Sequence, residues 1–246
     1  MCTVLWDRRS DVFTLAQWLK GRIYERRSDL SPDGRYMIYF AMNGQWNSET
    51  KGSWTAISRA PWLKAITLLS KGDCWNGGGL FTSNRTYWLN DGYGHHLMQE
   101  SSEVSQDTTY QPSEYYGGEC RGVYYLRLQR DGWTYLGRHK LGAWNDLDVF
   151  EKPLKKEWRL RKLAHAEIGA PPGKGCYWDE HELENETTGV TLKYPQWEWA
   201  EWDRNRLVWS TDGCLFTGEL EKQDLKEVRL LYNFNDLHFE PLCAPY

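Results

Sequence analysis

Hydrophobic and polar residues alternate in short runs along most of this chain, and many of these runs end at a glycine-containing turn. Runs of about 4–8 residues that are rich in Tyr, Trp, Val and Ile predict β-strands. Several runs adjoin an Asp-Gly pair, which tolerates the positive φ angles of a tight hairpin turn. These pairs are Asp33-Gly34, Asp91-Gly92, Asp131-Gly132 and Asp212-Gly213. The pattern therefore predicts an all-β protein made largely of hairpins.

Two of these hairpins are clearer than the others. The first joins residues 122–130 to residues 133–140 through Asp131-Gly132, and the second covers residues 206–220 around Asp212-Gly213. β-Formers lie on both sides of each turn, as a hairpin requires. Further strands are expected at residues 21–30, 35–43, 54–58, 157–165, 190–203 and 225–234, and residues 80–84 and 84–92 are expected to form a hairpin-like pair.

A few segments depart from this alternation. Residues 11–20 carry hydrophobic side chains at helical spacing behind Asp11, which predicts one short amphipathic helix with Asp11 as its cap. Residues 62–72 fit either a helical turn or a hydrophobic strand. Glycines at 77–79 after Asn76 predict a tight turn. Long loops are expected at residues 43–53, 92–118 and 166–189.

Composition narrows the class of protein. The 246 residues include 15 Trp and 15 Tyr, which supply a large buried area in a strand-rich core. The net charge of −4 argues against a general nucleic-acid binder, which would carry a basic balance or stripe. No stretch approaches the ~20 apolar residues that cross a bilayer. Because the six cysteines form no CxxC pair and the first residues carry charges where an export signal is hydrophobic, a reduced, cytoplasmic protein is expected.

Two hairpins resemble the repeats of known propellers. The run Leu30–Tyr36 followed by MIYFA is similar to the S-P-D-G hairpin of TolB-like and WD40-like β-propellers, and Arg206–Phe216 resembles a degenerate form of it. With about 40–45 residues per four-stranded unit, the chain length fits five units. The resemblance implies a single domain over residues 1–246 with the fold of an irregular five-bladed propeller. A two-sheet β-sandwich or an open barrel is the alternative.

Several further segments resemble an uncharacterised bacterial protein family. They are residues 21–33, 54–59, 77–81, 84–85 and 88–90. This resemblance implies a bacterial origin and transfers no activity and no catalytic residue.

The segment from Trp75 to His96 is the main candidate for a ligand site. It combines aromatic rings with amide, carboxylate and guanidinium groups around a run of glycines, as a sugar or another polar ring ligand requires. Core packing of the same tryptophans is the alternative. Its candidate residues are Trp75, Asn76, Arg85, Trp88, Asn90, Asp91, His95 and His96. The glycines do not precede a helix and no P-loop lysine follows them, so no nucleotide cofactor is expected.

A second candidate site lies in the strand expected at residues 21–30. Arg22, Tyr24 and Arg26 would share one face of that strand and could bind an anion or the carboxylates of a partner. Pairing of these arginines with acidic residues inside the fold is an equally good interpretation.

Other chemistry-bearing residues show no specific pattern. The acidic run Asp179–Glu182 lacks the spacing of a metal site, and we expect an exposed loop there and no metal. A glycosidase needs two carboxylates across a cleft, and the sequence cannot pair its candidates, which are Asp29, Asp33, Asp91, Glu119 and Asp203. Cys74 could serve as a nucleophile or as a small hydrophobic residue.

The sequence thus favours binding over catalysis. The first hypothesis is a protein-interaction module that uses the loops at 43–53, 92–118 and 166–189. The alternative is a carbohydrate-binding protein or a glycoside-hydrolase-like enzyme with its site near residues 75–96.

Overall fold

The computed structural model describes residues 1–246 and confirms the all-β class. About 48% of the residues lie in strands and 6% in helices, and five sheets are present, none of them closed into a barrel. Internal contacts divide the chain into two compact units. The first contains Met1–Arg130 with Phe239–Tyr246, and the second contains Asp131–His238. The expectation of a single domain stays a prediction.

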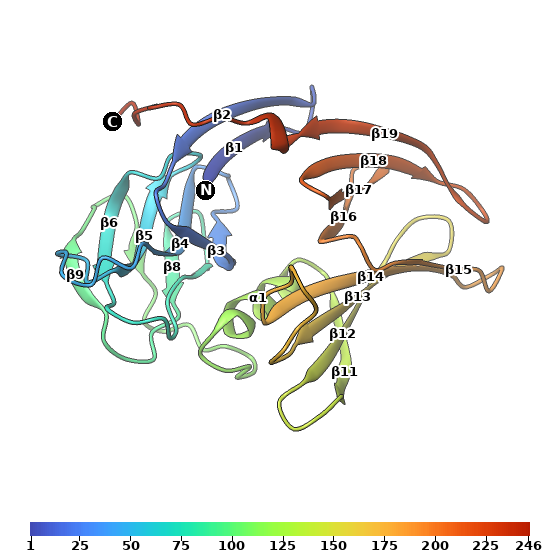
Figure 1. The fold of residues 1–246 in the computed structure, drawn as a ribbon, viewed down its shortest axis with the longest axis horizontal. Coiled ribbons are helices and arrows are strands. Elements are labelled where there is room, and N and C mark those ends of the chain that lie inside the picture. Colours follow the sequence, from blue (N-terminus) through green and yellow to red (C-terminus); the bar gives the residue numbers. More distant parts are fainter. The chain divides into compact units, whose positions relative to one another are not determined.

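The first unit holds three sheets and the one α-helix of the chain (Figure 1). A two-stranded sheet consists of β1 (Cys2–Asp7) and β2 (Val12–Trp18). A five-stranded sheet contains, in spatial order, β3 (Arg22–Leu30), β4 (Tyr36–Met42), β5 (Ser53–Arg59), β6 (Ala65–Ser70) and β9 (His96–Gln99). A three-stranded sheet has the order β10 (Ser105–Gln106), β8 (Thr86–Leu89) and β7 (Gly79–Phe81). The helix α1 spans Cys120–Arg130.

The core of the first unit lies on both faces of the central strands β4 and β5. Ile38 and Ile57 belong to one hydrophobic cluster, and Tyr39 and Ala56 belong to a second one. All four are at most 1% exposed. Burial on both faces explains why β4, with the sequence YMIYFAM, is a continuous hydrophobic run.

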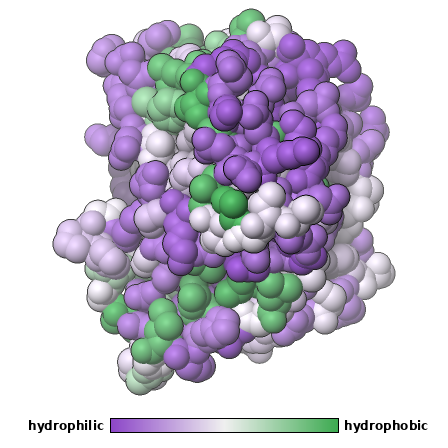
Figure 2. Space-filling model, turned by 90° about the vertical axis from the view of Figure 1, so that its right-hand side faces the viewer, coloured by the Kyte–Doolittle hydropathy of each residue, from purple (hydrophilic) through white to green (hydrophobic).

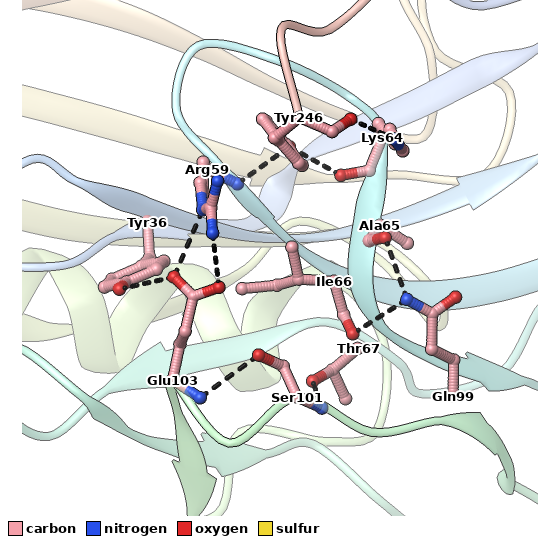
Figure 3. A network of polar contacts seen from close by, with 10 residues as sticks. All are labelled: Tyr36, Arg59, Lys64, Ala65, Ile66, Thr67, Gln99, Ser101, Glu103 and Tyr246. Carbon is pink, nitrogen blue, oxygen red and sulfur yellow. Dashed lines mark hydrogen bonds and ion pairs between the residues drawn. The ribbon is translucent and has the colours of Figure 1, made fainter.

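A polar network fixes the end of the chain and the loop after β9 to this unit (Figure 3). The Tyr246 hydroxyl accepts a hydrogen bond from the Arg59 amide at 3.1 Å and donates to the Lys64 carbonyl at 2.7 Å. Glu103 accepts two bonds from the Arg59 guanidinium, at 2.6 and 3.1 Å, and one from the Tyr36 hydroxyl at 3.0 Å. These bonds attach residues 239–246 and the segment around Glu103 to β4, β5 and the β5–β6 connection.

The expected hairpin over residues 122–140 is wrong in its first half, because residues 120–130 form α1. Strand propensity favoured an extended conformation for this Val- and Tyr-rich run, but tertiary contacts override propensity. Val123 and Tyr125 are at most 1% exposed, and α1 packs against β3 and β7. Gly132 has a φ of 90° just after the helix, and glycine with positive φ also ends helices.

The helix expected at residues 11–20 is also wrong, because Val12–Trp18 form β2. Asp11 has a φ of 55° and its amide donates to the Asp7 carbonyl at 2.9 Å, which closes a hairpin with β1. Trp6 stacks on Phe13 directly across this hairpin, with ring centroids 5.7 Å apart. Cross-strand aromatic packing thus outweighs the local helical spacing.

The second unit contains two antiparallel sheets in which consecutive strands pair (Figure 1). The first sheet contains β11 (Thr134–Lys140), β12 (Asp146–Pro153), β13 (Trp158–Ala166), β14 (Tyr177–Asn185) and β15 (Thr191–Tyr194). The second contains β16 (Trp199–Asp203), β17 (Arg206–Thr211), β18 (Cys214–Leu220) and β19 (Leu225–Asn233), and a 3-10 turn, Phe234–Asp236, follows it. The hairpin expected around Asp212-Gly213 is confirmed as β17–β18.

The loop expected at residues 166–189 is partly wrong, because β14 occupies its second half. Alternate residues of β14 point inward, and Asp179 and His181 are at most 2% exposed. The outward residues are acidic and face basic residues of the neighbouring strands. Arg161 lies 2.7 Å from Glu184, and Lys193 lies 3.2 Å from Glu182. Charge pairing across strands therefore lets a highly charged run form a strand.

The surface is strongly polar. The face drawn in Figure 2 is largely hydrophilic, with hydrophobic residues gathered in a few places, which agrees with a mean hydropathy of −0.74. None of the helices has the length and hydrophobicity needed to span a membrane.

Candidate functional site

The first unit contains a small pocket between the end of β8 and the segment that leads into α1. Its volume is about 140 Å³. Residues of the predicted site meet there with residues from a distant part of the sequence. The lining residues are Asn76, Trp88, Leu89, Asn90, Asp91, Gly92, Pro112, Glu114, Tyr115, Tyr116, Gly117, Gly118, Gly122 and Leu126.

The predicted glycine turn forms one wall of the pocket. Asn76, Gly77 and Gly78 have φ angles of 57°, 83° and 71°, a left-handed run that glycine adopts without strain. The Gly77 amide donates to the Asn90 carbonyl and the Asn90 amide donates to the Gly78 carbonyl, both at 2.9 Å. This pairing extends the β7–β8 ladder and brings Asn76 next to Asp91.

Two asparagine side chains join this turn to the segment before α1. The Asn90 amide nitrogen donates to the carbonyls of Gly77 and Gly118, each at 3.3 Å. With its amide oriented to match its neighbours, Asn76 donates to the Gly118 carbonyl at 3.0 Å and accepts from the Gly92 amide at 2.8 Å. Both amide nitrogens are therefore engaged by backbone carbonyls of the pocket.

The approach of these segments requires glycine at two positions. A Cβ atom added to Gly92 or to Gly118 would overlap the Asn76 amide. A larger residue at either position would displace the Asn76 amide from its hydrogen bonds with Gly118 and Gly92.

Aromatic rings form much of the remaining wall. Trp88 is half-buried and its ring centroid lies 5.8 Å from that of Tyr110. Tyr116 is buried and packs edge-to-face on Tyr125 of α1 at 5.2 Å. Tyr115 is 85% exposed and stands at the solvent side. An exposed aromatic side chain beside a polar pocket is a common feature of recognition sites.

Two carboxylates line the pocket, and each of them accepts a hydrogen bond from a neutral group. Asp91 Oδ1 lies 2.8 Å from Nδ1 of His95. Glu114 accepts a hydrogen bond of 2.7 Å from the Tyr116 hydroxyl. Burial lowers the pKa of His95 below its ordinary value, and the hydrogen bond with Asp91 offsets this only in part. His95 is therefore neutral at pH 7 and donates its Nδ1 proton to Asp91.

The same histidine completes an Asp–His–Thr arrangement. Nε2 of His95 lies 3.0 Å from the Thr55 hydroxyl, whose oxygen also accepts from the Gly78 amide at 2.9 Å. The order of these groups matches a hydrolase triad. Thr55 is completely buried, however, so no substrate carbonyl can reach its oxygen. The arrangement holds the pocket wall in place and provides no nucleophile.

Four residues of the predicted site lie outside the lining. Trp75 is 60% exposed, with its amide bonded to Asp73. Arg85 is exposed in the β7–β8 turn, at the other end of β8 from Asp91. His96 is exposed in β9. His95 does not line the pocket but forms a hydrogen bond with Asp91, which does. The Asp91-Gly92 pair also makes no hairpin, since β9 pairs with β6 and not with β8.

The sequence analysis missed the wall that residues 112–126 supply. Glu114, Tyr115 and Tyr116 lie in a stretch predicted only as an irregular loop. The run Tyr115-Tyr116-Gly117-Gly118 combines aromatic residues with glycines, as the first wall does, and was the available signal.

The second predicted site is not assembled as one face. Arg22 lies over the Tyr24 ring at 4.8 Å, while Arg26 lies over the Tyr124 ring of α1 at 4.6 Å. The pairing of β3 with β4 is irregular between Tyr24 and Asp29, which breaks the alternation of faces. Arg26 thus packs against the helix of its own unit.

The other candidate carboxylates serve the fold. Asp29 receives two bonds from Arg130, at 2.6 and 2.8 Å, and Asp33 accepts from Ser31 within its turn. Asp203 is bonded to Arg206 in β17. No group of three or more His, Cys, Asp or Glu side chains is placed to hold a metal ion.

Comparisons with known proteins add no assignment. No protein-family model matches the chain, and no curated protein sequence matches it. The geometry of the pocket is therefore the observation that bears on function.

Proposed function

We propose that this chain is a binding protein whose pocket in the first unit holds one small polar molecule. The observation that carries this proposal is the meeting of Trp88, Asn90 and Asp91 with Glu114 and Tyr115 around one cavity. Concave sites that combine aromatic walls with a few convergent polar groups are the usual form of a ligand site.

The size of the pocket favours binding over cleavage. A cavity of about 150 Å³ accepts benzene, and drug-sized sites span about 300–1,000 Å³. At about 140 Å³ the pocket holds one ring-sized molecule. A glycosidase must hold the sugars on both sides of the bond that it cleaves. Two carboxylates in a cavity for one ring therefore support recognition and do not suit glycoside hydrolysis.

A thermal-shift screen with paired tryptophan variants tests the proposal. The purified chain is heated with millimolar monosaccharides, amino acids and small ammonium compounds. A class that binds raises Tm by several degrees at about 100 times its Kd. Trp88→Leu should abolish the shift, whereas Trp75→Leu, which removes an exposed ring outside the lining, should retain it. Absence of any shift, or equal loss in both variants, contradicts the proposal.

Interaction with another protein is the second candidate. Three connections between strands each carry an exposed large hydrophobic residue. Trp46 between β4 and β5 is 51% exposed, Tyr93 between β8 and β9 is 91% exposed, and Ile168 between β13 and β14 is 68% exposed. Exposed hydrophobic residues on loops support partner binding. A partner that co-purifies with the chain and is lost after Trp46→Ser, Tyr93→Ser and Ile168→Ser would favour this function, provided that no small molecule gives a shift.

We also propose that the five sheets are the blades of an irregular propeller. Their number and the pairing of consecutive strands in both sheets of the second unit support this arrangement. A compact domain of this length has a radius of gyration of about 18 Å. Small-angle scattering should give this value, and a clearly larger radius would contradict the propeller.

We further propose a cytoplasmic location. All six cysteines are free thiols, as a reducing compartment maintains them. Fractionation of cells that express the chain should recover it with cytoplasmic markers.

A further inference from the structure

The charge of the pocket is negative and uncompensated. Its lining contains two acidic residues, Asp91 and Glu114, and no lysine, arginine or histidine. Neither carboxylate forms an ion pair with a lysine or arginine side chain. Each is oriented by a neutral donor, His95 Nδ1–H or the Tyr116 hydroxyl. The donors fix the carboxylates and leave their charges in place.

The amide donors of the pocket are already bonded, whereas its carboxylates can accept further hydrogen bonds. The amide nitrogens of Asn76 and Asn90, which a sugar hydroxyl would need as donors, are taken by the carbonyls of Gly77 and Gly118. The carboxylate oxygens keep free lone pairs, since Asp91 and Glu114 each have one hydrogen-bonding partner. A ligand that complements these carboxylates carries positive charge.

The aromatic walls complement the same chemistry. The face of an aromatic ring carries negative potential, and a cation within about 6 Å of its centre is attracted to it. Trp88, the ring type that binds cations best, lines the same pocket as Tyr115 and Tyr116. Rings together with carboxylates form the cages that recognise alkylated ammonium groups.

We propose that the pocket binds the alkylated ammonium group of a small organic cation, which it encloses between Trp88 and Tyr115 and neutralises with Asp91 and Glu114. This proposal rests on the proposed function, because it specifies the ligand class of the same pocket. A trimethylammonium group is close in size to benzene and fits a cavity of about 140 Å³.

Calorimetric titration with a matched pair of ligands tests the charge requirement. Choline is compared with 3,3-dimethylbutan-1-ol, which has the same shape and no charge. Choline should bind at least tenfold more tightly. Raising the salt concentration from 20 to 300 mM should weaken choline binding, because salt screens the attraction between the cation and the carboxylates. A parallel titration with N-acetyl-trimethyl-lysine amide distinguishes a free metabolite from a modified protein side chain as the source of the group.

Exposed side chains provide variants that keep the fold. Glu114→Gln and Tyr115→Leu should each weaken choline binding by about threefold to tenfold, in line with one lost charge or cation–π contact. Tyr115→Trp should restore it. Tyr93→Leu is the matched control, because Tyr93 is 91% exposed in the connection between β8 and β9 and does not line the pocket. It should bind as the original chain does.

The outcomes separate this inference from the proposed function. Equal affinity for choline and its neutral analogue, or unchanged binding in Glu114→Gln and Tyr115→Leu, overturns the cation proposal. A neutral monosaccharide that binds in a Trp88-dependent manner while choline does not also overturns it and leaves the pocket as a ligand site. Failure of every compound to bind overturns both.

Discussion

The buried ion pair between β3 and α1 allows the most quantitative prediction. The Asp29 side chain is 3% exposed and accepts two bonds from Arg130, at 2.6 and 2.8 Å, and one from the Phe81 amide at 2.8 Å. One carboxylate thus connects β3, α1 and β7. Asp29→Asn keeps the shape of the side chain but removes its charge and turns an amide nitrogen toward a donor.

The magnitude follows from the burial of the two partners. Breaking a fully buried pair costs about 3–5 kcal/mol, because a charge is left without a partner. Arg130 is 38% exposed and regains water, which reduces the cost. We therefore expect the free energy of unfolding to fall by about 2–3 kcal/mol, which lowers Tm by roughly 5–10 °C for a domain of this size.

Urea unfolding followed by far-UV circular dichroism measures this change, with calorimetry for Tm. Arg35→Gln is the control, since Arg35 is 72% exposed and lies 3.6 Å from Asp33 in an exposed pair of the same unit. Arg35→Gln should leave the midpoint of urea unfolding unchanged. If Asp29→Asn shifts the midpoint no more than Arg35→Gln, the pair does not hold α1 and the reasoning is refuted.

Three further predictions concern the pocket and the thiols. Gly92→Ala should lower Tm and abolish ligand binding, because its Cβ would overlap the Asn76 amide, whereas Gly175→Ala, which has open space around it, should change neither. The free energy of unfolding should decrease as the pH falls below about 6.5, the ordinary pKa of His, since the unfolded chain then gains a proton that buried His95 does not. Urea midpoints from pH 5 to 8 should show this slope, and His95→Gln should reduce it. Cys120 is buried and burial raises its pKa, so it should react with a thiol reagent more slowly than exposed Cys74 in a timed labelling assay.

The predictable part of the fold is the part that local spacing determines. Strand β4 follows from its hydrophobic run, and strands β17 and β18 follow from their β-forming residues. Each of these runs adjoins an Asp-Gly turn, which predicts a strand whatever surrounds it. Helix α1 could not be recognised in this way. Its Val and Tyr residues fit a strand by propensity, and only packing on β3 and β7 selects the helix.

The same division applies to the pocket. The turn at Asn76–Gly79 was predictable, since consecutive positive φ angles require glycine-rich sequence. The wall formed by Glu114 and Tyr115 was not, because it depends on hydrogen bonds from the Asn76 and Asn90 amides to the distant Gly118 carbonyl, which is 28 residues from Asn90 and farther from Asn76. The spacing of residues along the sequence does not indicate that these distant segments pack together.

Uncompensated charge, and not the density of acidic residues, distinguishes the site from the acidic strand β14. The acidic residues of β14 are the most conspicuous in the sequence, yet Glu182 and Glu184 face Arg161 and Lys193 across the sheet. Paired in this way, they offer little attraction to a ligand. Asp91 and Glu114 stand apart in the sequence and have only neutral partners. Backbone carbonyls bind the amide donors of Asn76 and Asn90, whereas the carboxylates of Asp91 and Glu114 remain charged. The proposed selectivity for a cation follows from this difference.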